Sequence, residues 1–331
     1  MINENRIKLS LISFCVGLLL VLLVFYLLPE TGIGFHDRLD SLRYQYAILI
    51  LFSIFLHHYI MAVKWRFVSV ELAGDSRQPL IFYYGYVVLS SVIGQVIPHY
   101  VGSVGVRAVA MKFHGVSSAR RGAAFSVYDH LFDLFVLGVL IVPAVSYIFG
   151  WIDLWHAAAI GAVVFALAGA ALVVHMERVF DLMLMVLKRV LDLFGSRKAA
   201  DYDLKARIPE RVFEREVVLK LILLSLLRYF NLVLFGFLIA LFISVDIELL
   251  EMVMLTPLAQ LATILTITPG GLGTMEWTWI GMLPQIGHSY QEASVYALFH
   301  RLVGVGGLLL LGLLSFPAIA LARRNRDARS N

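Results

Sequence analysis

Charged residues and cysteines are scarce in this sequence. Only 15% of the 331 residues are charged and 60% are hydrophobic, whereas a soluble domain carries about 25% charged residues. The longest polar stretch, at about 177–216, is too small and too charged to form a core of its own. These shortages exclude a large soluble domain between the hydrophobic segments. We therefore expect residues 1–331 to form a single membrane domain.

Several motifs of soluble enzymes are also missing. The single cysteine, Cys15, excludes an internal disulfide framework, and none of the ten histidines forms a metal-ligand spacing such as H-x-x-x-H. The sequence has no phosphate-binding loop and no dinucleotide-binding fingerprint. We expect no metal, no cofactor and no ATP-driven transport by this chain alone. The net charge of +4 is typical of a membrane protein whose Lys and Arg gather on the cytoplasmic face, so no nucleic-acid partner is expected.

Six uninterrupted hydrophobic runs are long enough to cross a hydrocarbon core of about 30 Å. They occupy residues 9–28, 44–63, 123–143, 156–174, 217–243 and 292–321. The first run is followed by Pro29-Glu30 and lacks a small-residue cleavage site, so we expect an uncleaved anchor. Two further hydrophobic stretches, 79–112 and 249–283, are interrupted by proline and glycine. The residues that we expect at their tips are Pro98, Gly102 and Gly105 in the first, and Pro269, Gly270, Gly271 and Gly273 in the second.

The distribution of Lys and Arg indicates how the interrupted stretches sit in the membrane. Ten basic residues lie in 175–220 and four more in the C-terminal tail, whereas the loops 144–155, 244–251 and 284–291 have none. The basic segments, including the loop 64–78 with Lys64, lie in the cytoplasm only if each interrupted stretch enters and leaves on one side. The loop 29–43, with Arg38 and Arg43, is a mild exception. The predicted fold is an all-α integral membrane protein with six transmembrane helices and two re-entrant helical hairpins, and with both termini in the cytoplasm.

Under this topology the two hairpins enter the membrane from opposite faces, and the sequence repeats in agreement with it. At an offset of 171, Pro98-His99-Tyr100-Val101-Gly102 matches Pro269-Gly270-Gly271-Leu272-Gly273. We predict an inverted repeat of residues 44–174 and 217–322, joined by a cytoplasmic amphipathic and basic linker at 175–216. The alternative is that the interrupted stretches are only kinked packing helices. Residues 177–194 are predicted to form an amphipathic helix, either at the membrane interface or as a soluble cover over the domain.

Ionisable residues inside membrane segments cost about 2.5 kcal/mol or more each and indicate function by default. The candidates for substrate binding or translocation are Arg107, Asp129, His130, Asp133, Arg228, Glu276, His300 and Arg301. One interpretation is that the arginines face a cavity and bind a phosphate-bearing headgroup, with the carboxylates positioning them or carrying protons. The other is structural, with buried pairs Arg301–Asp133 and Arg107–Glu276, or with Arg107 as a cytoplasmic anchor. The tryptophans Trp151, Trp155, Trp277 and Trp279 are expected in the interfacial belt.

The order of these motifs resembles the lysylphosphatidylglycerol synthase transmembrane family, a flippase-like domain. The resemblance covers nearly the whole chain, and its most specific part is Pro269-Gly270-Gly271-Leu272-Gly273-Thr274-Met275-Glu276. It implies re-entrant helices around a central cavity, a role in lipid translocation and a location in a prokaryotic plasma (inner) membrane. This sequence has Asp129-His130 where the family commonly shows Glu-Arg before the aspartate of the span. The 331 residues contain no synthase domain, so we do not expect the transferase activity of multidomain members.

The leading functional hypothesis is a flippase-like or scramblase-like translocase for an anionic phospholipid or a polyprenyl-phosphate-linked lipid, not an enzyme. Two alternatives stay open. One is a scaffold subunit for a membrane glycosyltransferase or lipid synthase, and the other is an intramembrane lipid transferase that uses the Asp129 and Asp133 carboxylates. The expected partners are membrane lipids, with a lipid-modifying synthase, a glycosyltransferase or a second copy of the chain as further alternatives.

Overall fold

The computed structural model describes residues 42–72, 78–97, 99–193, 210–265 and 268–330, and within these ranges every regular element is helical. The helices are α3 (Ala47–Phe67), α4 (Leu80–Ile93), α5 (His99–Phe113), α6 (Ala119–Ile148), α7 (Leu154–Leu193), α9 (Arg215–Phe242), α10 (Leu249–Leu265), α11 (Thr274–Met282) and α12 (Tyr290–Ser330). The prediction of an all-α fold is therefore confirmed for this part of the chain.

Five of the described helical segments are long and apolar enough to cross a membrane. They are Tyr44–Val70, Ala119–Ile148, Leu154–Leu182, Arg215–Phe242 and Tyr290–Ser315. Each coincides with one of the predicted spans, whereas the predicted span at 9–28 lies outside the described residues. Helices suit the hydrocarbon interior of a membrane because their backbone N–H and C=O groups bond to each other, and no water is present there to bond to free ones.

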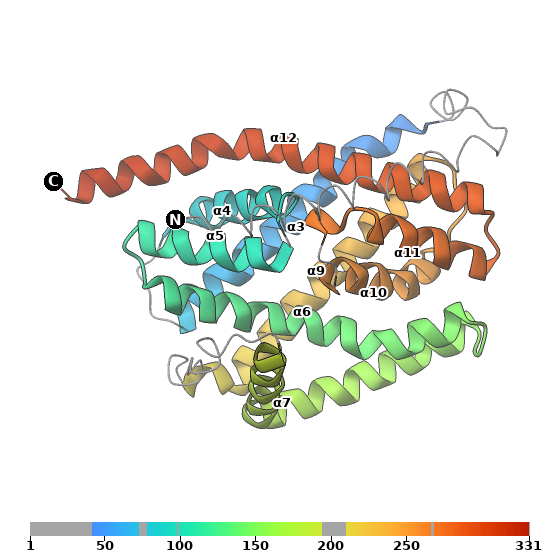
Figure 1. Cartoon of the computed structure of the whole chain (residues 1–331), viewed down its shortest axis with the longest axis horizontal. Helices are drawn as coiled ribbons and strands as arrows, with labels where there is room; N and C mark the ends of the chain where they lie inside the picture. The colour runs from blue at the N-terminus through green and yellow to red at the C-terminus, as the bar shows by residue number, and fades with distance from the viewer. Residues whose placement is uncertain (1–41, 73–77, 98, 194–209, 266–267, 331) are drawn as a thin grey trace.

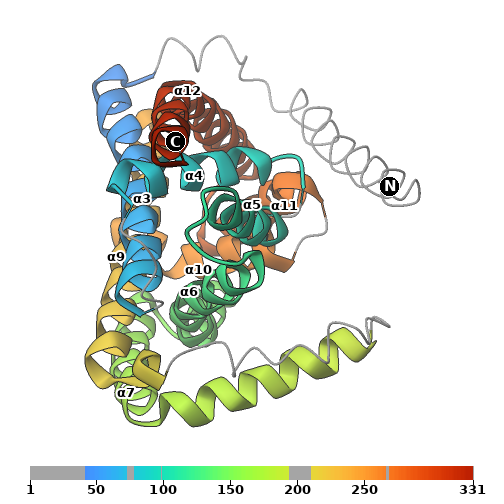
Figure 2. The same ribbon diagram turned by 90° about the vertical axis from the view of Figure 1, so that its left-hand side faces the viewer.

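The two interrupted stretches form helix pairs that approach from opposite ends of the molecule. In Figure 1, α4 and α5 occupy the left half, and α10 and α11 occupy the right half. The packing partners exchange in a regular way: α4 packs on α12 and α5 on α6, while α10 packs on α6 and α11 on α12. Viewed from the left in Figure 2, α4 and α5 lie in front of α10 and α11, with α6 and α12 on either side of them. The long helices α3 and α9 pack on each other.

The breaks within the two pairs meet inside the molecule. The backbone N–H of Gly270 donates a hydrogen bond to the carbonyl oxygen of Gly94 at 3.0 Å. The second break contains three glycines with positive φ, Gly270 (59°), Gly271 (70°) and Gly273 (82°), a region that favours glycine because it has no Cβ. The chain therefore turns at the second break where the Pro-Gly-Gly-x-Gly run predicts it.

The turn of the first pair does not lie where the sequence predicts it. Gly102 and Gly105 are inside α5, and the turn follows α4 at Gly94. The predicted tip residue Pro98 lies outside the described residues. A Cβ on Gly102 would come within 3.4 Å of the Gly94 backbone, so the glycine lets α5 pack closely on the turn without forming it. The prediction of Gly102 and Gly105 as tip residues is therefore wrong, because both lie within α5 and the chain turns before that helix begins.

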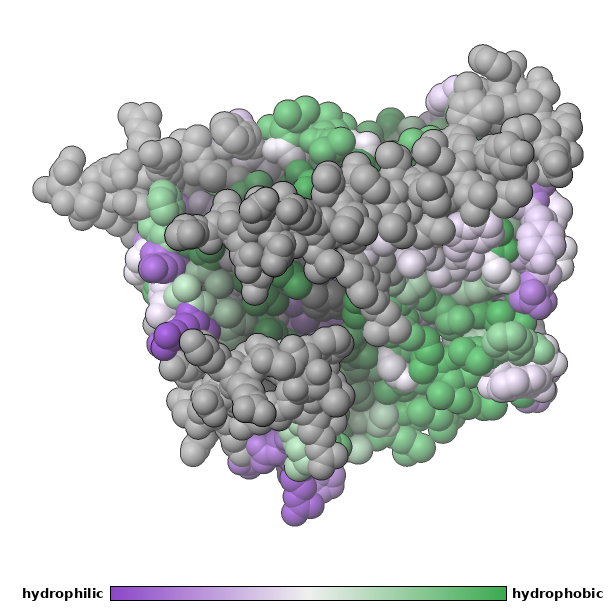
Figure 3. Space-filling model, viewed as in Figure 1, coloured by the Kyte–Doolittle hydropathy of each residue, from purple (hydrophilic) through white to green (hydrophobic). Residues whose placement is uncertain are grey.

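Helix α7 changes direction at His175, near the end of its membrane-length segment Leu154–Leu182. His175 has non-helical angles (φ −119°, ψ 24°), and the part of α7 that follows it runs across the end of the bundle (Figures 1 and 2). Val179, Leu182 and Met185 are exposed on it, while Phe180 is buried. The helix predicted at 177–194 is thus present over 177–193. Figure 3 shows hydrophobic residues over the lower right of this face, where α6 and α7 lie, and hydrophilic residues near the second half of α7.

The N-terminus of α7 is capped outside the membrane-length segment. Asp153 accepts hydrogen bonds from the backbone N–H and the ring of His156. The backbone hydrogen bond contributes most to a pKa of the Asp153 carboxyl below its usual range, as expected for an acidic N-cap.

We expect Gly270→Ala to destabilise the fold, because the new Cβ would lie 2.7 Å from Oε1 and 3.2 Å from Cα of Gln95 at a φ of +59°. Strained backbone of this kind costs about 1–3 kcal/mol. The melting temperature in detergent, followed by intrinsic fluorescence, should fall by several degrees. Gly281→Ala is the matched control, since no atom lies within 4 Å of its Cβ position. An equal melting temperature for both variants would contradict the close approach of the two breaks.

Candidate functional site

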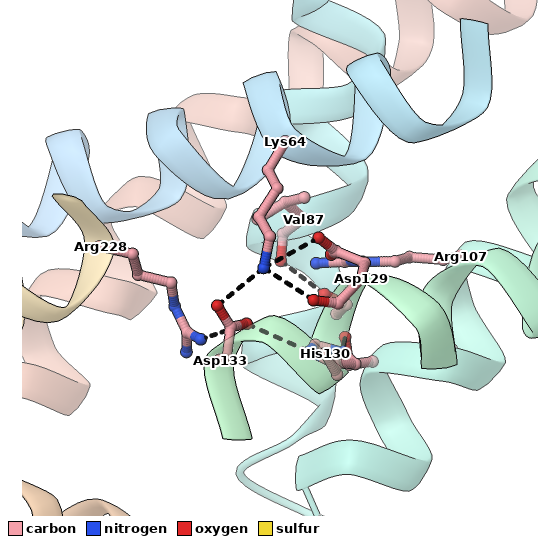
Figure 4. Close-up of polar contacts among 9 residues, drawn as sticks. Lys64, Val87, Arg107, Asp129, His130, Asp133 and Arg228 are labelled. Carbon is pink, nitrogen blue, oxygen red and sulfur yellow. Dashed lines mark hydrogen bonds and ion pairs between the residues drawn. The ribbon is translucent and has the colours of Figure 1, made fainter. Parts of the chain in front are cut away.

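Five charged side chains from four helices form one buried cluster, which we call the charge cluster: Lys64, Arg107, Asp129, Asp133 and Arg228. The ammonium of Lys64 lies between the two carboxylates, 3.1 Å from Oδ1 of Asp129 and 2.8 Å from Oδ1 of Asp133. Arg107 approaches Asp129 from one side (Nη1–Oδ2 2.6 Å), and Arg228 approaches Asp133 from the other (2.6 Å). Figure 4 shows this row of alternating charges.

The charge cluster is removed from water. Lys64, Arg107, Asp129 and Asp133 are all at most 6% exposed, and the Arg107 guanidinium also lies over the ring of Trp65, 5.3 Å from its centroid. His130 extends the cluster toward α5, because its Nε2 hydrogen-bonds the Ser103 hydroxyl at 3.0 Å. Three cations face two carboxylates, so within the described residues the charge cluster carries one uncompensated positive charge. A buried charge of this kind attracts an anion or must be tolerated at a cost.

Lys64 is the functional candidate that sequence reasoning missed. Its position between the apolar run 44–63 and Arg66 made it look like a cytoplasmic loop residue. In the structure it belongs to α3 and is buried (1% exposed). The prediction that Lys64 lies in a loop is therefore wrong. Its burial is explained by α6, because its ammonium contacts the carboxylates of Asp129 and Asp133 and the carbonyl oxygen of Asp129, which lie 65 and 69 residues further along the chain.

A second ion pair lies at the break before α11. The guanidinium of Arg301 contacts Glu276 through Nε and donates from Nη1 to the Gly270 carbonyl oxygen at 2.7 Å. Oε2 of Glu276 accepts the backbone N–H of Gly273 at 2.8 Å, which caps the first turn of α11. Glu276 and Arg301 therefore hold the break in place together. The predicted pairs Arg301–Asp133 and Arg107–Glu276 are wrong, since the partners of these arginines are Glu276 and Asp129.

A cavity of about 200 Å³, which we call the polar lobe, connects the two charged groups. Its wall includes Arg228 from the charge cluster, Arg301 and Gly270 from the second break, and the carboxamides of Gln95 and Gln260. A neighbouring cavity of about 170 Å³, the apolar lobe, is lined by α3, α4, α9 and α12. The two lobes share five wall residues: His57, Gln95, Leu232, Phe235 and Gly304. They therefore form one two-part cavity beside the meeting point of the breaks.

Aromatic rings complete the wall of the polar lobe. His300 packs on Phe235 (5.0 Å between ring centroids) and on Trp279 (5.6 Å). Trp279 is only 2% exposed, so its expected place in the interfacial belt is wrong. Trp151 and Trp155, at 72% and 75% exposed, have the exposure that a belt residue needs.

Comparison with known families agrees with this architecture. A family model described as the lysylphosphatidylglycerol synthase TM region matches residues 10–312. The chain belongs to this family. The match confirms the resemblance found in the sequence motifs, and it supports a multi-pass membrane protein with a function connected with membrane lipids. A search of the curated proteins found no match.

For this family member, the structure divides the predicted site residues into groups. Arg107, Asp129, His130, Asp133 and Arg228 come together in or beside the charge cluster. Glu276, His300 and Arg301 come together at the second break. The complete burial of Arg107 and its pairing with Asp129 overturn the alternative of a cytoplasmic anchor. Arg228, His300 and Arg301 border the polar lobe. Arg107 and Asp129 pair with each other and do not line this lobe.

Proposed function

We propose that this protein is a lipid translocase, which moves an anionic lipid between the leaflets of a prokaryotic plasma membrane. The observation that carries the proposal is the two-part cavity beside the contact of the two helix breaks. Two arginines border it, Arg228 from the charge cluster and Arg301 from the ion pair at the second break. Guanidinium groups bind phosphate oxygens well because their planar donors match the geometry of the anion. Binding sites at broken helices between inverted repeats are typical of transporters.

The same proposal gives the topology. The chain crosses the membrane six times, and the α4–α5 and α10–α11 pairs are re-entrant hairpins in an inverted repeat of residues 44–174 and 217–322. The exchange of packing partners supports this, because each hairpin contacts both α6 and α12, the spans that follow the hairpin in the first and in the second half. The distribution of the connections also supports it. The α5–α6 connection and the C-terminus lie at the left in Figure 1, and the cation-free α6–α7 and α11–α12 connections lie at the right.

Reconstitution into liposomes tests the function. Vesicles with fluorescently labelled anionic lipid in both leaflets are treated with dithionite, which reduces only the label exposed outside. We expect the protected half of the label to become accessible when the protein is present, and to stay protected in empty vesicles. Equal protection in both preparations, over several anionic lipid classes, would refute the translocase and favour a scaffold for a lipid-modifying synthase or glycosyltransferase.

Cysteine labelling tests the topology. The only native cysteine, Cys15, is first replaced by serine, and single cysteines are then placed at the exposed positions Lys112, at the end of α5, and Gln285, before α12. With an impermeant maleimide we expect Gln285→Cys to react in intact cells and Lys112→Cys to react only after lysis. Reaction of both positions from the same side would overturn the inverted arrangement.

A further inference from the structure

The polar lobe contains no carboxylate among the described residues that line it. Its charged wall residues are Arg228 and Arg301. The two nearest carboxylates are already paired with these guanidinium groups, Asp133 with Arg228 and Glu276 with Arg301. Asp133 lines a smaller adjoining cavity of about 20 Å³, which shares Arg228 and Gln260 with the polar lobe. A lipid with an ammonium in its headgroup would therefore meet two guanidinium groups and no free negative partner. Placing like charges next to each other in this way costs several kcal/mol.

The unused hydrogen-bonding groups of the polar lobe describe its ligand more closely. Nη2 of Arg301 is buried and has no acceptor within the described part of the chain, although its other two nitrogens are bonded. Buried donors normally have a partner, so this nitrogen is suited to a ligand oxyanion. The carboxamides of Gln95 and Gln260 likewise make no side-chain hydrogen bond to the described residues, and each offers both donors and an acceptor. Hydroxyl groups of a ligand, which both donate and accept hydrogen bonds, are suited to these two carboxamides.

The aromatic rings of the polar lobe do not replace the missing carboxylate. A quaternary or protonated amine is held by aromatic faces that are open to it. Here Trp279 and Phe235 both pack against His300, and Trp279 also packs against Tyr296 at 4.9 Å. The guanidinium of Arg301 borders the same space. The lobe is therefore not a cage for cations.

The apolar lobe complements the polar one. Its polar wall residues are largely engaged with each other: Asn231 donates to the Ser53 carbonyl oxygen at 2.9 Å, and Nδ1 of His58 lies 2.7 Å from the Ile54 carbonyl oxygen. The remaining wall includes Ile54, Leu232, Phe235 and Leu308. Each lobe is below the roughly 300 Å³ at which pockets for drug-sized ligands begin, so the pair fits a headgroup and the start of a hydrocarbon chain.

We propose that this cavity selects a lipid phosphodiester whose headgroup carries hydroxyl groups and no amine. The proposal rests on the proposed function and names the substrate class of the same site. One phosphodiester carries one negative charge, which matches the single uncompensated positive charge of the charge cluster beside it. Both a glycerophospholipid such as phosphatidylglycerol and a prenyl phosphoryl hexose have this chemistry. The aminoacylated phospholipid in the name of the family does not.

Binding of short-chain lipids to the full chain in detergent tests the selectivity. The probes are dioctanoyl phosphatidylglycerol, a short prenyl phosphoryl mannose, dioctanoyl phosphatidylethanolamine and the lysyl ester of dioctanoyl phosphatidylglycerol, measured by native mass spectrometry. We expect at least one amine-free probe to bind at least tenfold more tightly than both amine probes. The amine-free probe that binds more tightly shows whether the natural ligand is a glycerophospholipid or a prenyl phosphoryl hexose. Amine probes that bind within threefold of the better amine-free probe would overturn the proposal.

An isosteric substitution makes the test independent of folding. Gln260→Glu places a carboxylate in the polar lobe, and we expect it to reduce the preference for the amine-free probe at least tenfold. Gln285→Glu, at an exposed position outside the cavity, should leave the preference unchanged. An unchanged preference in Gln260→Glu would locate binding elsewhere and overturn the proposal. Transport of all four probes at equal rates in liposomes would refute the proposed selectivity but not the translocase function. Selective binding without transport would refute the translocase function but not the selectivity.

Discussion

Asp133→Asn should cost the folded protein about 3–5 kcal/mol, the range found when one partner of a buried ion pair is removed. The Asp133 carboxylate contacts both Lys64 and Arg228 in a site that is almost inaccessible to water. Asparagine keeps the shape and removes the charge, so three buried cations would face the single carboxylate of Asp129. The free energy of unfolding, measured by titration with dodecyl sulfate in mixed micelles, should report the loss directly.

A second substitution separates charge from packing. In Lys64→Met/Asp133→Asn the charge cluster again carries one net positive charge, so we expect the double variant to be clearly more stable than Asp133→Asn alone. Lys64→Met by itself leaves two matched pairs, and replacing buried ions by an apolar side chain of similar size is often neutral or stabilising. Asp246→Asn, at an exposed position, should stay within about 0.5 kcal/mol of the wild type. A double variant no more stable than Asp133→Asn would mean that charge balance is not what the cluster requires.

The sequence predicts the helices of this protein better than it predicts their contacts. The spans follow from hydropathy, which depends on the solvent and needs no knowledge of neighbouring helices. The second break follows from local chemistry, because a run of glycines next to a proline cannot continue a helix. For the first break the same reasoning fails, since the glycine of Pro-x-x-x-Gly also serves where two segments pack closely, and Gly102 has that role.

The ion pairs illustrate what sequence patterns leave undetermined. The predicted pairs joined residues from different halves of the chain, whereas Arg107 binds Asp129 and Arg301 binds Glu276 within the same half. The halves are joined instead by Arg228 and Asp133. Which carboxylate an arginine reaches depends on where two helices cross, and hydropathy does not record this. A lysine at the end of a hydrophobic run could have been suspected as a site residue, since long side chains can extend either to the interface or to a buried acid.

Arg301→Lys should lower lipid transfer in liposomes by about 10- to 100-fold, the effect of losing one charge-assisted hydrogen bond of roughly 1.5–3 kcal/mol. Lysine keeps the positive charge, but a single ammonium cannot contact Glu276, hold the Gly270 carbonyl oxygen and keep a third donor for a ligand, as the guanidinium does. The exposed pair of Arg211 and Glu214, 3.7 Å apart, supplies the control, because Arg211→Lys removes a surface arginine of the same kind and should leave transfer unchanged.

The double variant Arg301→Leu/Glu276→Gln separates a ligand contact from a structural pair. Arg301→Leu alone leaves Glu276 buried without its cation, so a loss of folding in that variant would not distinguish the two roles. With Glu276→Gln added, no buried charge is left unpaired at the break, and the amide can still accept the Gly273 backbone N–H. We expect the double variant to recover its melting temperature and to remain defective in lipid transfer. Recovery of both properties would mean that Arg301 only stabilises the break, and the scaffold hypothesis, in which the buried arginines are replaceable, would then account better for this family member.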